Sequence, residues 1–128
     1  MKTSMQICIL FISVSALFSN KAVAQEDVTN RTVLVINAIV NQEHNHELPG
    51  YLSQMMQIFK DNGGKPLGRY KTIEKIKGSL APEMIALVSF ENAETIKKML
   101  EGDKYKSLSE LRELVFSDLK IVLCTELN

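Results

Sequence analysis

The chain has 128 residues, which is enough for one domain and too few for two. Its fifteen basic and fifteen acidic side chains balance, so neither nucleic acid nor an anionic membrane is an expected partner on electrostatic grounds. Cys8 lies in an N-terminal apolar run, and only Cys124 falls in the remainder of the chain. No intramolecular disulfide is therefore expected, and the apolar core must stabilise the fold.

The N-terminal apolar run covers residues 7–18 and follows a single basic residue, Lys2. It precedes Ala22-Val23-Ala24, a small-residue pattern that is typical of a signal-peptide cleavage site. The run is too short for a transmembrane helix, which needs about 20 residues. A short core helix is the alternative, but the position and the cleavage pattern favour a signal peptide.

The expected boundaries follow from this leader. Residues 1–24 are predicted to be the signal peptide, residues 25–31 a flexible lead-in, and residues 32–128 the folded domain. The mature chain would carry thirteen basic and fifteen acidic residues, a net charge of −2. The prediction is a secreted or periplasmic protein with no stable membrane association after cleavage.

Strands are predicted where aliphatic and β-branched residues gather, at residues 32–40, 84–90 and 119–125. The first two are apolar on both faces, so both faces should be buried. Residues 65–77 are predicted to be extended and mostly polar, and their lysines suit an edge strand. Residues 78–82 form the following loop.

Helices are predicted between these strands. Apolar residues recur at helical spacing over residues 48–59, and Gly63-Gly64 should end that helix. Asn92 is placed to cap a second helix, and Asp103 or Ser107 could cap a third.

The resulting order, β-α-β-β-α-(α)-β, predicts an α+β fold of the ferredoxin-like, split βαβ type. Right-handed crossovers would place the strands at residues 32–40 and 84–90 in the centre of a four-stranded antiparallel sheet. All the helices would then cover one face. The apolar second face needs another cover, and a homodimer packed through this sheet face is the simplest one.

Several short motifs along the chain follow one recurring pattern, and they are Tyr51, Gly63-Gly64-Lys65, Lys77-Gly78, Pro82, Phe90 with Ala93, Asp103-Lys104-Tyr105 and Arg112. This pattern resembles the family called domain of unknown function 1330, within the dimeric α+β barrel superfamily, over residues 32–123. Arg69-Tyr70-Lys71 stands where that family often has glycines, so a pocket here is expected to differ in shape.

The resemblance implies a ferredoxin-like fold and a dimer whose two sheets form a barrel. It implies little about chemistry, because no general activity is attached to the family. The wider superfamily includes cofactor-independent monooxygenases, haem-degrading enzymes and small-molecule binders, and a shared fold transfers none of these functions.

Tyr105 and Arg112 are the first candidate site residues. They are seven residues apart, so they share a face if the helix is continuous, and together they could hold a carboxylate. The alternative is structural, with Tyr105 in the core and Arg112 paired with Glu110, Glu113 or a neighbouring strand. Arg69 and Tyr70 follow the helix-to-strand turn and should point to opposite faces, so one of them could reach a cleft while the other stays in solvent or packs; Arg69 is the one assigned to the site.

Other polar residues have a functional and a structural interpretation. Asn37 and Ser89 interrupt the two central apolar strands, and they could contact a ligand. A hydrogen-bonded pair or a simple packing substitution is the favoured interpretation. His44 and His46 lie together in a polar segment, but two histidines alone make an incomplete metal site. A solvated loop is the favoured interpretation, and no metal site is predicted.

The leading functional hypothesis is a module that binds a small molecule between sheet and helices, without a cofactor, and its predicted contacts are Asn37, Arg69, Tyr105 and Arg112. One alternative is a cofactor-independent, monooxygenase-like small enzyme, and another is a purely structural dimerisation module. The sequence identifies no catalytic residue.

Overall fold

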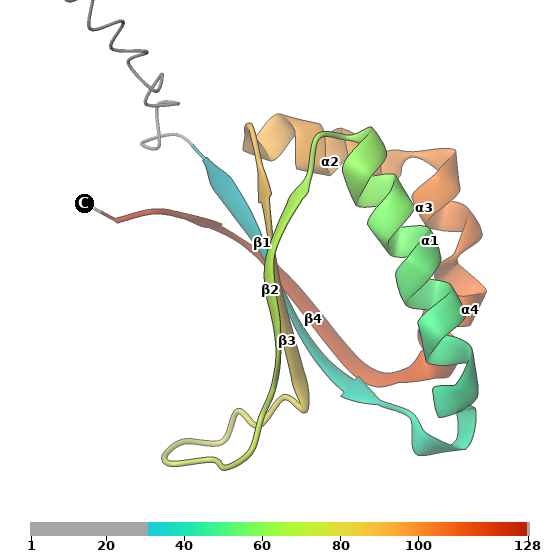
Figure 1. Cartoon of the computed structure of the whole chain (residues 1–128), viewed down its shortest axis with the longest axis vertical. Coiled ribbons are helices and arrows are strands. Elements are labelled where there is room, and N and C mark those ends of the chain that lie inside the picture. Colours follow the sequence, from blue (N-terminus) through green and yellow to red (C-terminus); the bar gives the residue numbers. More distant parts are fainter. Residues whose placement is uncertain (1–30, 128) are drawn as a thin grey trace, which may run out of the picture.

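The computed structural model describes residues 31–127. Their elements are β1 (Thr32–Val40), the 3₁₀ helix η2 (Gln42–Glu47), α1 (Leu48–Asp61), β2 (Lys65–Lys71), β3 (Met84–Phe90), α2 (Ala93–Glu101), α3 (Asp103–Ser107), α4 (Ser109–Val115) and β4 (Phe116–Thr125) (Figure 1). The predicted signal peptide lies outside the described residues. Within residues 31–127, no helix has the length and apolar character needed to cross a bilayer.

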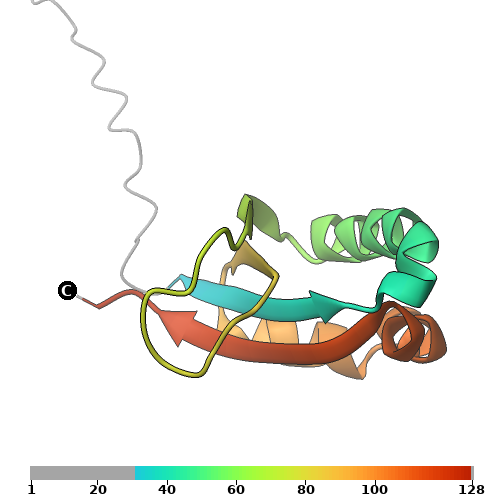
Figure 2. The same ribbon diagram turned by 90° about the horizontal axis from the view of Figure 1, so that it is seen from below.

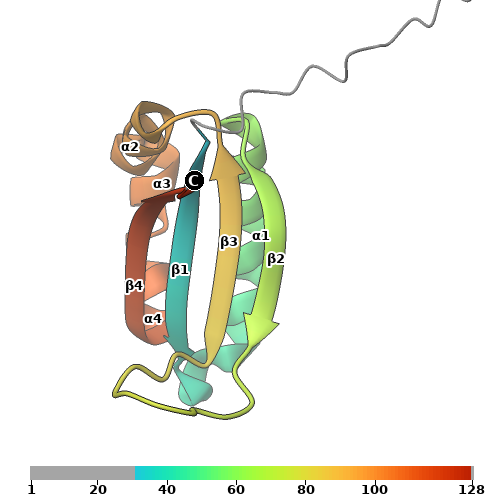
Figure 3. The same cartoon turned by 90° about the vertical axis from the view of Figure 1, so that its left-hand side faces the viewer.

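The strands form one antiparallel sheet in the order β2-β3-β1-β4 (Figure 3). β1 and β3 occupy the centre, as predicted. Leu34 on β1 lies opposite Val88 on β3 and is almost fully buried. Because side chains alternate along a strand, the row of Leu34 faces the helices and the row of Val35 faces away.

All the helices of the described chain lie on one face of this sheet (Figures 1 and 3). The most completely buried large side chains, Phe90, Leu34, Ile96 and Val115, lie in the layer between sheet and helices. A four-stranded antiparallel sheet with helices on one face is the ferredoxin-like arrangement. The predicted fold class is confirmed.

The turn from α1 to β2 depends on two adjacent glycines. Gly63 has φ +76, a left-handed conformation that suits glycine. Gly64 donates its backbone N–H to the Phe59 carbonyl at 2.7 Å. A Cβ at Gly64 would lie 2.8 Å from the Phe90 ring, so the tight approach to β3 requires glycine here. The predicted helix end is confirmed.

The helices after β3 follow the prediction in one case and depart from it in another. Asn92 caps α2 through its Oδ1, which accepts the Thr95 backbone N–H at 2.9 Å. The single third helix is wrong, because the chain breaks at the buried residue Leu108 into α3 and α4. The predicted caps are also wrong: α3 and α4 have no side-chain cap, and Ser107 Oγ donates back to the Lys104 carbonyl at 2.6 Å.

The second strand is also shorter than the extended segment predicted at residues 65–77. β2 ends at Lys71 because β3, its partner, begins only at Met84. Residues 72–83 form a loop that projects from the end of the sheet on the side away from the helices (Figures 1 and 2). Ile73 and Ile76 in this loop are 97% and 86% exposed.

Candidate functional site

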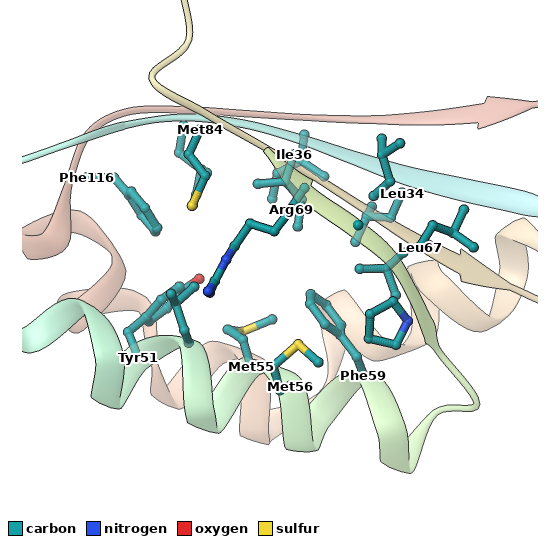
Figure 4. Close-up of a pocket in the computed structure, with 18 of the residues that line it drawn as sticks. Leu34, Ile36, Tyr51, Met55, Met56, Phe59, Leu67, Arg69, Met84 and Phe116 are labelled. Carbon is teal, nitrogen blue, oxygen red and sulfur yellow. The ribbon is translucent and has the colours of Figure 1, made fainter. Parts of the chain in front are cut away.

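A cavity of about 410 Å³ lies between α1 and the helix-facing side of the sheet. The sheet contributes Leu34, Ile36 and Met84, and α1 contributes Met55 and Phe59 (Figure 4). Its volume falls within the range of about 300 to 1,000 Å³ that is common for small-molecule sites. The cavity is therefore large enough for an organic ligand.

The cavity opens to solvent where some of the residues that line it are exposed. Met56 on α1 is 44% exposed and Leu67 on β2 is 53% exposed. Arg69, also on β2, is exposed as well. Three methionines, Met55, Met56 and Met84, line the cavity, and flexible thioether side chains adapt readily to different apolar shapes.

Arg69 is directed into this cavity by the register of β2. It lies opposite Ala86, which belongs to the helix-facing row of β3, whereas Tyr70 lies opposite Ile85 on the other face. Its side chain extends from β2 across the cavity towards Tyr51 on α1 (Figure 4). No residue among 31–127 forms an ion pair or hydrogen bond with Arg69.

Arg112 occupies a different environment, although it was predicted as part of the same site. Its Nε donates to Tyr51 Oη at 3.1 Å, and its Nη2 donates to the Tyr105 carbonyl at 2.8 Å. The guanidinium carbon also lies 3.7 Å from the centre of the Tyr105 ring. Arg112 thus joins α4 to α3 and α1. Tyr105 lines the cavity, whereas Arg112 lies behind its wall.

Tyr51 connects this cluster to the cavity. Its side chain is only 5% exposed, it lines the cavity, and its ring meets Phe116 edge to face at 5.3 Å. Burial raises the pKa of the Tyr51 phenol above its ordinary value of 10.0, and the hydrogen bond from Arg112 opposes that rise. The hydroxyl therefore stays protonated at neutral pH and remains a donor.

Asn37 is not brought together with the other three predicted site residues. It lies opposite Ile85 and Lys120, in the row of the sheet that faces away from the helices. There it lines a separate groove of about 270 Å³, together with residues 79–82 of the projecting loop. Ser89 lies on the same face, opposite Val33. Neither Asn37 nor Ser89 therefore lines the cavity between sheet and helices.

The histidines do not contribute to the cavity either. His44 and His46 lie in η2, with ring centres 6.3 Å apart, and neither lines the cavity. Within residues 31–127, no group of three His, Cys, Asp or Glu side chains is placed to hold a metal ion.

Tyr51 is the residue that the sequence did not assign to the site. It belongs to the apolar stripe of α1 with Leu48, Leu52 and Met55, so its spacing indicates a core position. The one available signal was its polar hydroxyl within that stripe, because a buried phenol needs a hydrogen-bond partner. The partner, Arg112, is 61 residues away in sequence.

Comparison with known proteins identifies the family. The family profile described as Domain of unknown function (DUF1330) matches residues 23–125, which confirms the resemblance found in the sequence. No curated protein matches this sequence.

Solved structures share the fold at low sequence identity. A protein of unknown function from Rhodopseudomonas palustris has a TM-score of 0.67 and 10% identity, covering 86% of this chain and 95% of that one. A DABB family protein with a ferredoxin-like fold from Mesorhizobium loti has a TM-score of 0.57 and 9% identity, covering 77% and 98%. A proposed antibiotic biosynthesis monooxygenase from Bacteroides thetaiotaomicron has a TM-score of 0.55 and 19% identity, covering 79% and 93%. At these identities the likeness concerns the fold alone.

Proposed function

The chain belongs to the domain of unknown function 1330 family, and from that premise we propose that it is an exported, homodimeric protein that binds a small molecule between sheet and helices. The observation that carries this proposal is the cavity of about 410 Å³, lined mostly by apolar side chains. A largely apolar cavity with few polar groups is typical of a ligand site. Arg69, Tyr51 and Tyr105 are the polar side chains proposed to contact the ligand.

Binding is favoured over acid–base catalysis by the residues that line the cavity. Neither histidine lines it, and no aspartate or glutamate does so within the described residues. Histidine is the side chain that ordinarily titrates near neutral pH. The cavity thus offers apolar surface, two phenols and one guanidinium, which suit holding a ligand better than moving a proton.

The proposed dimer is supported by the outer face of the sheet. Val33, Val35, Ile39 and Ile85 lie in outward-facing rows of the central strands, and Val122 on β4 is 49% exposed. An apolar sheet face of this kind commonly marks an interaction surface. The loop at residues 72–83 projects to the same side with two exposed isoleucines, so a second copy on this face would also meet the loop (Figure 1).

Export is proposed on the sequence of residues 1–24 alone, since these residues lie outside the described part of the structure. The basic start, the short apolar run and the Ala-Val-Ala pattern support it. Sequencing the N-terminus of the protein recovered from the culture medium or periplasm tests it. A first residue at Gln25 is the expected result, and a cytoplasmic protein that keeps Met1 would refute it.

Native mass spectrometry of the exported protein tests the binding function. We expect a dimer that carries extra non-covalent mass. The variant Met56→Trp should lose that mass, because a larger ring at the partly exposed mouth would occupy the cavity. Gln54→Trp is the matched control, since Gln54 is an exposed residue of α1 that does not line the cavity. A dimer without added mass, or mass that Met56→Trp retains, would contradict a ligand in this cavity.

A further inference from the structure

The polar groups of the cavity suggest which class of ligand it takes. Arg69 is the one charged side chain among the described residues that line the cavity, and the others are apolar apart from two tyrosines. Arg69 extends towards Tyr51, so a guanidinium and a phenol lie on the same side of an otherwise apolar space (Figure 4). A ligand in this cavity would meet both groups at one end.

The guanidinium of Arg69 has no anionic partner in the described part of the chain. A guanidinium is charged at every pH of interest and matches a carboxylate with two parallel hydrogen bonds. Arg112 shows the contrast, because it is bound to Tyr51 and Tyr105. Of the two predicted arginines, Arg69 is therefore the one available to an anion.

The hydroxyl of Tyr51 provides a second donor. It accepts a hydrogen bond from Arg112 Nε at 3.1 Å, and among residues 31–127 its own proton has no acceptor. Tyr51 is a buried residue, only 5% exposed. An unpartnered buried donor is costly, and an acceptor on a ligand would remove that cost.

The size of the cavity limits the rest of the ligand. Its volume of about 410 Å³ corresponds to roughly 14 water molecules at about 30 Å³ each. An organic molecule of about a dozen non-hydrogen atoms fits this space. Leu34, Met55 and Phe59 line the part of the cavity that would surround its apolar body.

We infer that the ligand is an apolar carboxylate, such as a medium-chain acyl or an aryl acid, whose carboxylate is bound by Arg69 and Tyr51. This inference rests on the proposed function, and it names the ligand class for the same cavity. Arg69 is exposed and extends towards the buried Tyr51, so the carboxylate would lie between these two groups and the carbon chain would pack against the apolar lining (Figure 4).

Calorimetric titration with decanoate and with decan-1-ol tests the inference, because the two probes have similar apolar bodies and differ in charge. We expect decanoate to bind about 10- to 100-fold more tightly than the alcohol, the preference that a charged hydrogen bond gives. Arg69→Met should abolish this preference, so that the variant binds decanoate and decan-1-ol with similar affinity. Tyr51→Phe should weaken decanoate binding about 3- to 10-fold. Lys71→Met, which removes a charge from the same strand outside the cavity, should keep the preference.

The outcomes separate this inference from the proposed function. If acid and alcohol bind equally, or if Arg69→Met keeps the preference for acid, the inference is wrong and the cavity remains a binding site. If neither probe binds, the inference is again wrong. Native mass spectrometry then tests separately whether the cavity binds any small molecule. The circular dichroism spectrum of Arg69→Met should match that of the wild-type protein, because Arg69 is exposed. A matching spectrum shows that the variant is folded.

Discussion

Arg112 is expected to stabilise the fold, and Arg112→Ala tests that role. The substitution removes two charged hydrogen bonds, to Tyr51 Oη and to the Tyr105 carbonyl, and the contact of the guanidinium with the Tyr105 ring. A hydrogen bond to a charged group contributes about 1.5 to 3 kcal/mol, and a cation–π contact about 0.5 to 2 kcal/mol. Because Arg112 is half-buried and the three contacts are not additive, we expect a loss of about 2 to 4 kcal/mol.

Urea denaturation followed by circular dichroism measures this loss. A domain of this size is stable by about 5 to 15 kcal/mol, so Arg112→Ala should remain folded with a lower midpoint. Lys98→Ala is the control, because the Lys98–Glu94 pair is exposed and such pairs contribute only about 0.3 to 0.5 kcal/mol. The double variant Arg112→Ala/Tyr51→Phe should lose about 1 kcal/mol less than the sum of the single variants, since both remove the same hydrogen bond.

A loss no larger than that of Lys98→Ala would refute a structural role for Arg112. Strict additivity with Tyr51→Phe would mean that the hydrogen bond between Arg112 and Tyr51 contributes nothing, and the role would then rest on Tyr105 alone. If Arg112→Ala weakened decanoate binding without changing the free energy of unfolding, Arg112 would belong to the ligand site instead.

Three further predictions concern the outer face, the buried phenol and the glycine turn. Val35→Asp should convert the proposed dimer to a monomer in light scattering, whereas Ser53→Asp, on the exposed side of α1, should leave it dimeric; a dimeric Val35→Asp would contradict assembly through this face. Tyr51 should ionise above pH 10.0 in an ultraviolet titration. Because its folded pKa is raised, its contribution to stability is complete below the unfolded pKa and is lost as pH rises through the folded pKa. Tyr51→Phe should therefore lose less stability at high pH, and equal losses would refute the assignment. Gly64→Ala should cost about 1 to 3 kcal/mol in urea denaturation, because its Cβ would lie 2.8 Å from the Phe90 ring; an unchanged midpoint would count against this packing.

The sequence predicted the fold well because the relevant signals are local. β1 and β3 are apolar on both faces, which is what central strands require. The paired glycines end α1, and Asn92 begins α2, through contacts within a few residues. The break at Leu108 could not be predicted in this way, because it accompanies the burial of one side chain in the core formed by distant elements.

The site was predicted less completely because it depends on long-range register. Alternation along β1 shows that Asn37 and Leu34 lie on opposite faces of the strand. It does not show which of the two faces packs against the helices. The direction of Arg69 depends on the irregular pairing of β2 with β3 between Pro66 and Gly68. A one-residue shift of register exchanges the two faces of a strand, so no single-strand pattern could place Arg69 inside and Asn37 outside.

The cavity itself follows from how α1 is supported on the sheet. Near the start of the helix, Tyr51 meets Phe116 edge to face at 5.3 Å, and near its end Phe59 meets Phe90 edge to face at 6.0 Å. These two pairs are eight residues apart, about 12 Å along a helix, and Met55 lies between them. The space beside Met55 therefore lies between two aromatic pairs, and Phe59 forms part of its wall. Because a core relaxes only partly after a large-to-small substitution, Phe59→Leu should enlarge the cavity and lower the free energy of unfolding by about 1 to 3 kcal/mol in urea denaturation. An unchanged midpoint would mean that the Phe59–Phe90 pair does not support α1 on the sheet.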